Sequence, residues 1–291
     1  MENNEWSIQS FENQYLEEQM KREEKPSEWW RGSDMGSCMR KRIWQRKGIK
    51  KTEEITIIQR RTMDVGSMFH WKYQKLFEKL GLLIEKEGEV IDESLHFKGH
   101  FDVLAGGIPE VKKELFEFTN KEGKLWLDSN GYDFAIKLKE KIDKEYPNGL
   151  PKLLYELKTQ HSMSFQYIEK KPNEEHFYQL CSYLFFLREK YPDIKEGRIL
   201  YISKDDSRLV EFPIKLTKEI EDKIINELVM LNDYWKNDEL PPQISEIDGK
   251  SVNWKCRFCP YKTLCRGEGW EENLKKQIAR EKYAAKKSIK S

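Results

Sequence analysis

Hydrophobic residues recur at three- and four-residue spacing in three long stretches, and each stretch predicts a helix. The first covers residues 64–83, where Gly81 is a suitable end. The second covers residues 172–191 and has Asn173 as its expected N-cap, with acidic residues in the first turn and basic residues in the last. The third covers residues 217–236 and leads into the cysteine-rich end of the chain.

Alternation of apolar and polar residues predicts strands between these helices. The region 89–107 ends in Gly-Gly, residues 152–159 read KLLYELKT, and residues 197–203 and 208–214 predict a pair of strands. Residues 108–150 are charged and rich in turn residues, so we interpret them as an insertion between two strands. The order of these elements predicts an α/β fold with a mixed central sheet flanked by helices.

Charge is distributed unevenly, although 52 basic residues nearly balance 51 acidic ones over the 291 residues. Residues 1–30 carry eight acidic and three basic residues, whereas residues 31–61 carry ten basic and three acidic ones. Residues 271–291 carry seven basic and three acidic residues. The basic segments could follow a phosphate backbone, and solvated helix faces explain them equally well. We expect an acidic N-terminal arm (1–30), one main domain (31–270) and a basic C-terminal tail (271–291).

The sequence carries no sign of export or of membrane insertion. The N-terminus lacks a basic region followed by an apolar one, and the apolar run YLFFL at 183–187 is far too short to cross a bilayer. We therefore expect a cytoplasmic protein with no membrane partner. The five cysteines of such a chain are better explained as thiols or metal ligands than as disulfides.

Three cysteines form the strongest local pattern. Cys256, Cys259 and Cys265 follow C-x2-C-x5-C, a spacing that can turn three thiols onto one centre. Every histidine lies upstream, so a fourth cysteine ligand would be Cys38 or Cys181. Cys181 stands in an apolar helical stretch and suits a buried core position, whereas Cys38 lies in a Gly/Ser-rich stretch beside basic residues. Zinc and an iron–sulfur cluster both remain open on this chemistry.

The stretch YELKT at 155–159 ends an apolar run with an acid and a base two residues apart. On a strand, Glu156 and Lys158 point to the same face. An exposed ion pair is the common explanation of such a pattern. A metal-binding carboxylate beside a catalytic ammonium is the alternative, and the other motifs of the chain favour it.

Three further features belong with this pair. Gly66 and His70 form G-x-x-x-H near a helix start, Asp102 interrupts a hydrophobic strand, and Gln179 and Tyr183 share a helix face. A carboxylate in the middle of a strand needs a partner or a cation. With the E-x-K pair, these residues provide carboxylates and an imidazole for a divalent metal and a lysine to orient water, as phosphodiester hydrolysis requires.

In this order the motifs resemble the RecB-like branch of the PD-(D/E)XK nucleases, which share a restriction-endonuclease-like core. With one early cysteine and the late trio, the chain is more closely similar to the iron–sulfur members. These include a CRISPR-associated exonuclease family, helicase–nuclease subunits of the AddB type and related phage exonucleases. The motifs span residues 38–265, which is most of the chain.

The resemblance implies a metal-dependent DNA exonuclease, often acting 5′→3′ on single strands, in phage or host recombination and repair or in CRISPR adaptation. It implies Mg²⁺ or Mn²⁺ bound by His70, Asp102, Glu156 and the Leu157 carbonyl, with Lys158 as the catalytic lysine. Recombination or CRISPR-adaptation proteins would be partners beside DNA.

The resemblance assigns two more sets of residues. One completes the active site and helps to place DNA: Gln179 and Tyr183. The other holds a [4Fe–4S] cluster that joins the N- and C-terminal segments around residue 38 and residues 254–266: Cys38, Cys256, Cys259 and Cys265.

The chain departs from the compact family members in two respects. About 50 residues separate Asp102 from Glu156, and the acidic N-terminal arm has no counterpart in the family pattern. The insertion could narrow a DNA channel, bind a partner or alter the polarity of digestion. Three other functions compete with an exonuclease: an endonuclease, a non-catalytic nucleic-acid-binding scaffold that keeps the cluster, and a zinc-binding module unrelated to nucleases.

Overall fold

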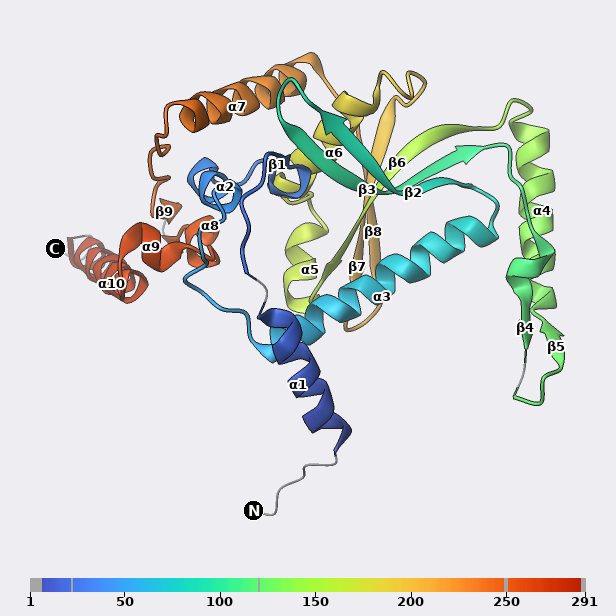
Figure 1. The fold of residues 1–291 in the computed structure, drawn as a ribbon, viewed down its shortest axis with the longest axis horizontal. Coiled ribbons are helices and arrows are strands. Elements are labelled where there is room, and N and C mark those ends of the chain that lie inside the picture. The colour runs from blue at the N-terminus through green and yellow to red at the C-terminus, as the bar shows by residue number, and fades with distance from the viewer. Residues whose placement is uncertain (1–6, 22, 120, 249–250, 289–291) are drawn as a thin grey trace. The chain divides into compact units, whose positions relative to one another are not determined.

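The computed structural model describes residues 7–21, 23–119, 121–248 and 251–288, with side chains up to residue 280. The chain divides into two compact units, traced in Figure 1. The first comprises Met1–Trp29, Ser37–Arg61 and Met230–Ser291, and the second comprises Trp30–Gly36 and Thr62–Val229. The predicted arm and tail lie partly outside the described residues, at 1–6, 22 and 289–291. The predicted division into arm, domain and tail stays a prediction.

The second unit is built on a six-stranded sheet in the order β1-β3-β6-β7-β8, with β2 also pairing with β3. The pairs β2–β3, β3–β6 and β7–β8 are antiparallel, and β1–β3 and β6–β7 are parallel. The predicted mixed sheet is therefore confirmed. The strands are β1 (Trp30–Arg31), β2 (Leu83–Asp92), β3 (Phe97–Gly107), β6 (Leu150–Gln160), β7 (Glu196–Ser203) and β8 (Leu209–Ile214).

Helices accompany this sheet, as the α/β prediction requires. One face of the sheet carries a buried cluster that includes Val103, Leu157 and Ile202, and aromatic side chains of α3 pack against it. The helices associated with these strands are α3 (Ile57–Lys79), α4 (Ser129–Glu145), α5 (Ser162–Ile168), α6 (Glu174–Leu187) and α7 (Lys218–Lys236), and the 3₁₀ turns are η1 (Gly32–Asp34) and η2 (Lys113–Phe116).

Helix α3 differs from its prediction in extent and in orientation. It begins seven residues before the expected start at residue 64 and ends at Lys79, two residues before Gly81. Met68 and Trp71, which belong to the apolar pattern, are exposed. The face that contacts the sheet carries Phe77, which also belongs to the pattern, together with Phe69 and Tyr73, so the strands beneath the helix determine which side is buried.

Helix α6 agrees with its prediction at its N-terminus, but it ends at Leu187, so the basic residues expected in its last turn lie beyond it. Asn173 is the N-cap, and its side chain accepts a hydrogen bond from the N–H of Glu175 at 2.8 Å. Eight of the 14 residues of α6 are buried, including Leu180 and Leu184. A Cβ atom on Gly197 of β7 would lie 2.9 Å from the Leu180 side chain, so the absence of a side chain there lets the helix approach the strand.

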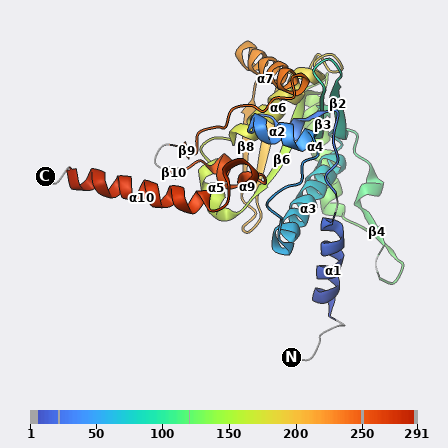
Figure 2. The same cartoon turned by 60° about the vertical axis from the view of Figure 1, so that its left-hand side comes forward.

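The segment between β3 and β6 folds into elements of its own. It contains η2, the hairpin of β4 (Glu117–Thr119) and β5 (Leu125–Leu127), and α4. Asp128 caps α4 by accepting a hydrogen bond from the N–H of Gly131 at 3.0 Å. Both views show the hairpin set apart from the six-stranded sheet (Figures 1 and 2). The role predicted for this insertion stays a prediction.

The first unit brings together segments from both halves of the chain. The rings of Trp44 and Tyr261 lie 5.5 Å apart, and the Tyr261 hydroxyl donates to the Ile49 carbonyl at 3.2 Å. Its elements are α1 (Ile8–Met20), α2 (Met39–Arg46), β9 (Ile247–Asp248), β10 (Ser251–Val252), α8 (Trp254–Arg257), α9 (Lys262–Arg266) and α10 (Trp270–Ser288). None of the described helices combines the length and the apolar character that crossing a membrane requires.

Part of the basic segment around α2 is buried inside this unit. Arg42 and Arg46 are both almost inaccessible to solvent. Arg46 donates to the carbonyls of Ser27 and Glu28 and lies over the ring of Trp235. Burial lowers its pKa to about 10. These two arginines have structural roles, so phosphate binding by this segment would depend on its other bases.

Candidate active site and cysteine pocket

The candidate active site lies where β3 and β6 begin to separate. The strand ladder pairs Val103 with Tyr155, and the next residues along the two strands are Asp102 and Glu156. Asp102 Oδ2 accepts a hydrogen bond from the N–H of Leu157 at 2.6 Å, so this side chain continues the contact between the strands. Both carboxylates are buried. The structure therefore brings two of the predicted metal ligands together.

A short chain of polar side chains extends from Glu156 to α6. Lys158 Nζ lies 2.7 Å from Glu156 Oε1 and donates to Gln179 Oε1 at 3.0 Å. Gln179 Nε2 donates to Glu156 Oε1 at 2.7 Å and to the Tyr183 hydroxyl at 3.2 Å. Glu156 is only 2% exposed, so the alternative of a solvent-exposed ion pair on the strand is wrong. Gln179 thus contacts the other three residues predicted for this part of the site: Glu156, Lys158 and Tyr183.

Tyr183 is held between two glycines. A Cβ atom on Gly32 of η1 or on Gly99 of β3 would lie 2.5 Å from the Tyr183 ring, which is far inside contact distance. The ring of Phe97 meets Tyr183 edge-on at 6.3 Å. Burial raises the pKa of Tyr183 well above its usual value, so its hydroxyl stays protonated at neutral pH.

Helix α3 brings His70 to the same carboxylates. A Cβ atom on Gly66 would lie 3.0 Å from Thr159 Oγ1, so a small residue is needed where the helix passes the end of β6. One turn further on, His70 Nδ1 lies 3.3 Å from Asp102 Oδ1. In the G-x-x-x-H motif, the glycine therefore lies close to Thr159, and the histidine contacts Asp102.

The charges of the site perturb one another. Burial raises the pKa of Glu156 and the Asp102 carboxylate raises it further, while Lys158 counteracts both. Burial lowers the pKa of Lys158, but the charges of Glu156 and Asp102 outweigh this, so the pKa lies above its ordinary value. The ammonium group therefore stays charged at neutral pH. When both carboxylates are ionised, their charge exceeds that of the single ammonium, and a cation would offset the excess.

One side chain at the site was not predicted. The ligand atoms of His70, Glu87 and Asp102 all lie within 4.8 Å of one another, a grouping that could hold a metal ion. Glu87 belongs to the charged run EKEGE on β2, which has the composition of a solvated strand. Its proximity follows from the pairing of β2 with β3, and spacing along the sequence carries no such signal. The prediction that the Leu157 carbonyl is a ligand stays a prediction.

Four cysteines line one pocket in the first unit. Cys38 is the N-cap residue of α2, and the other three lie in or beside α8 and α9. Trp44 and Arg266 are among the remaining lining residues. The cysteines of the pocket are those singled out from the sequence: Cys38, Cys256, Cys259 and Cys265. The residues predicted to form one centre are thus gathered in one place.

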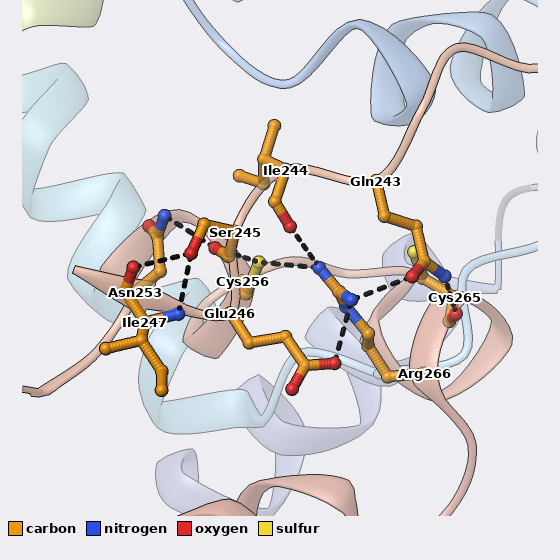
Figure 3. Close-up of polar contacts among 9 residues, drawn as sticks. All are labelled: Gln243, Ile244, Ser245, Glu246, Ile247, Asn253, Cys256, Cys265 and Arg266. Carbon is orange, nitrogen blue, oxygen red and sulfur yellow. Dashed lines mark hydrogen bonds and ion pairs between the residues drawn. The ribbon is translucent and has the colours of Figure 1, made fainter.

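The Arg266 side chain contacts several residues of the loop at 243–246 beside this pocket (Figure 3). Its guanidinium donates to Gln243 Oε1 and Glu246 Oε1, both at 2.8 Å, and also to the Ile244 carbonyl. One guanidinium nitrogen lies 3.8 Å from Cys256 Sγ. Burial raises the pKa of the Cys256 thiol and Arg266 counteracts it. A guanidinium in this position stabilises negative charge on sulfur, which a metal-bound thiolate carries.

Cys181 is separate from this group. It belongs to α6 and is inaccessible to solvent. Burial raises the pKa of its thiol to about 12, so the group stays protonated and inert at neutral pH. The prediction of a small buried core residue agrees with this placement.

A protein-family model matches the chain over most of its length. The family model of the PD-(D/E)XK nuclease superfamily matches residues 3–266. No curated protein matches the chain. A solved structure described as "Crystal structure of SSO0001" aligns with 18% identity over 90% of this chain and 98% of that one, with a TM-score of 0.49. This similarity is too low to support any conclusion about the chain.

Proposed function

Because the chain belongs to the PD-(D/E)XK nuclease superfamily, we propose that it is a metal-dependent DNA exonuclease. Membership supports hydrolysis of phosphodiester bonds in a nucleic acid with the help of Mg²⁺ or Mn²⁺. The finer parts of the proposal are a DNA substrate with free ends, a preference for single strands and digestion in the 5′→3′ direction.

A single observation carries the proposal. Glu156 Oε2 is buried and accepts no hydrogen bond from any residue in the described part of the chain. An ionised carboxylate oxygen in such a place is costly unless a cation or a donor meets it. Asp102 stands across from Glu156 on the neighbouring strand and contacts His70, and these side chains offer the oxygen and nitrogen ligands that divalent cations accept. The residues fit the metal that the family implies.

The roles of the residues follow from these contacts. His70, Asp102, Glu156 and the Leu157 carbonyl would hold the cation. When bound, it supplies Lewis-acid chemistry that offsets phosphate charge and makes water more acidic.

Two neighbouring residues prepare the reaction. Lys158, held by Glu156 and Gln179, donates to the attacking water or to a phosphate oxygen as negative charge develops there. Gln179 contacts both the Lys158 ammonium and the Glu156 carboxylate and so fixes their relative position. The buried Tyr183 hydroxyl accepts a hydrogen bond from Gln179 and holds that side chain in place.

The specificity for free ends is tested with two forms of the same single-stranded DNA. Linear and covalently closed circular molecules are incubated with the full chain and Mn²⁺, with a chelator as the metal-free control. The proposal predicts rapid loss of linear DNA, persistence of the circle, and no digestion with the chelator. Equal digestion of both forms would identify an endonuclease. No digestion of either form by a folded, metal-supplied protein would favour a non-catalytic binding protein.

We also propose that Cys38, Cys256, Cys259 and Cys265 hold a [4Fe–4S] cluster that stabilises the first unit. Four thiolates suit such a cluster. Four thiolates in one pocket would also hold a single zinc ion. The proposal of a cluster rests on the order of one early cysteine and a later C-x2-C-x5-C, which resembles the iron–sulfur members of the superfamily.

Metal analysis of the anaerobically purified chain decides between the two metals. The proposal predicts about four iron atoms per chain and a brown absorbance. One zinc atom per chain without iron would contradict the cluster and leave the nuclease proposal intact.

A further inference from the structure

Glu87 places a third carboxylate at the candidate metal site. It lies on β2, and its carboxylate oxygen is within 4.8 Å of ligand atoms of both His70 and Asp102. Ligands of Mg²⁺ at about 2.1 Å in octahedral geometry are about 3 Å apart when adjacent. Small rotations of a side chain such as Glu87, which is exposed, would bring the three atoms to that spacing.

The pairing of the strands explains why Glu87 is so close. Lys86 pairs with Val103 and Gly88 pairs with Phe101, so Glu87 stands across from Asp102. Two carboxylates directly opposite on antiparallel strands repel each other. A divalent cation between them would turn this repulsion into attraction.

The backbone of Glu87 adopts an unusual conformation. Its φ is +51°, a left-handed value that disfavours a residue with a side chain. Strain of this kind is commonly kept where it positions a functional group.

The neighbouring acidic residues of β2 form ion pairs, whereas in the described part of the chain Glu87 accepts a hydrogen bond only from a neutral amide. Glu85 accepts hydrogen bonds from Lys190 at 3.0 Å and Tyr191 at 2.6 Å. Glu89 forms an ion pair with Lys98. In the described part of the chain, no lysine or arginine pairs with Glu87.

The one contact of Glu87 also connects it to the site. Gln74 of α3 is buried, and its side-chain amide donates both to Glu87 Oε1 and to the Asp102 carbonyl at 3.3 Å. This neutral donor fixes one oxygen of Glu87 without neutralising its charge. On the strand next to Asp102, Glu156 Oε2 is buried and has no donor among the described residues, so it is a second carboxylate oxygen that a cation would satisfy.

We propose that Glu87 is a further ligand of the divalent cation bound by His70 and Asp102. The proposal rests on the proposed metal-dependent function and adds a residue to its site. Gln74 is then a positioning residue, since it acts on the metal only through Glu87 and the backbone of Asp102.

Isothermal titration of the full chain with Mn²⁺, without DNA, tests this ligand directly. Glu87→Gln keeps the shape of the side chain and removes its charge. The matched control is Glu89→Gln, two residues along the same strand, where the surface pair with Lys98 is lost instead. We expect Glu87→Gln to weaken Mn²⁺ binding at least tenfold and Glu89→Gln to change it less than twofold.

The titration also separates this inference from the function on which it rests. Mn²⁺ affinity within twofold of wild type in Glu87→Gln, together with its loss in Asp102→Asn, would overturn the role of Glu87 alone. Absence of Mn²⁺ binding by the folded wild type would overturn the metal-dependent function and this inference together. Equal weakening of Mn²⁺ binding by Glu87→Gln and Glu89→Gln would also overturn the role of Glu87, because the loss of any negative charge on this strand would then explain the change.

Discussion

His176, which is partly buried, and Glu156, which is buried, have pKa values that move in opposite directions. Burial raises the pKa of Glu156, and the Asp102 carboxylate adds to the effect. Burial lowers the pKa of His176 to about 3, and the charge of Lys158 adds to this effect. In each case the interior favours the neutral form. His176 is therefore uncharged at neutral pH, and its Nδ1 lies 2.8 Å from the Tyr201 hydroxyl.

The stability of the fold should depend on pH through His176. The unfolded chain binds a proton at this histidine below pH about 6.5, whereas the folded chain resists protonation down to about 3. The free energy of unfolding therefore falls as pH drops through this range, by roughly 2 kcal/mol at pH 5. His176→Gln should lose this part of the pH dependence, measured by urea unfolding at pH 7.5 and pH 5.

A matched variant controls for general effects of losing a histidine. His161 is exposed beside Asp205, so His161→Gln should keep the wild-type pH dependence. Glu156 contributes with the opposite sign, because a raised carboxyl pKa favours folding as pH falls. That contribution is common to all three proteins and cancels in the comparison. An unchanged pH dependence in His176→Gln would contradict the assignment.

At the scale of elements, the distance between α6 and its neighbours is determined by residues without side chains. Gly32 and Gly99 each leave room for the Tyr183 ring, and Gly197 leaves room for Leu180. The helix can therefore carry Gln179 close enough to contact Glu156 on β6. The geometry of the site depends on this close packing as well as on its polar residues.

A methyl group at residue 99 should disturb both packing and site. Gly99→Ala places a carbon 2.5 Å from the Tyr183 ring, and overpacking of this kind costs about 1–3 kcal/mol. We expect a matching loss in the free energy of unfolding and a lower rate of DNA cleavage. Lys98→Ala is the control, because it removes only a surface pair with Glu89. Wild-type stability in Gly99→Ala would show that Tyr183 has free space.

The hydrophobic periodicity of the sequence predicted where helices form better than it predicted which side of each helix is buried. The cap and apolar run of α6 were recognisable because Asn173 and the first-turn acids act locally. The exposed Met68 and Trp71 were misleading, since the choice of buried face on α3 depends on the strands beneath it. Glu87 was missed for a related reason, because the register of β2 against β3 is not encoded in local spacing.

At the scale of the whole molecule, cysteines more than 200 positions apart meet in one pocket. Cys38 joins the later trio because the first unit combines segments from both halves of the chain. The sequence was sufficient to select Cys38 over Cys181, since their surroundings differ in polarity. It could not give the Arg266 contacts, which depend on how the loop at residues 243–246 folds back.

Removal of one pocket cysteine should release the metal. Cys256→Ala is expected to lose most of the iron and its absorbance, and to lower the thermal midpoint of the first unit, because metal binding stabilises the fold. Cys181→Ala is the control, since Cys181 is buried elsewhere on α6. Iron content and thermal unfolding of both variants give the answer. Full iron retention in Cys256→Ala would exclude this cysteine as a ligand.

The central claim is that Lys158, beside Glu156, serves hydrolysis of DNA. The most direct measurement compares Lys158→Ala with Lys152→Ala on end-labelled single-stranded DNA with Mn²⁺. Lys152 lies on the same strand and pairs with the exposed Asp193. The account predicts a loss of cleavage of about a hundredfold or more in Lys158→Ala, an intact fold and iron content, and wild-type activity in Lys152→Ala. Cleavage by Lys158→Ala at the wild-type rate would contradict the account.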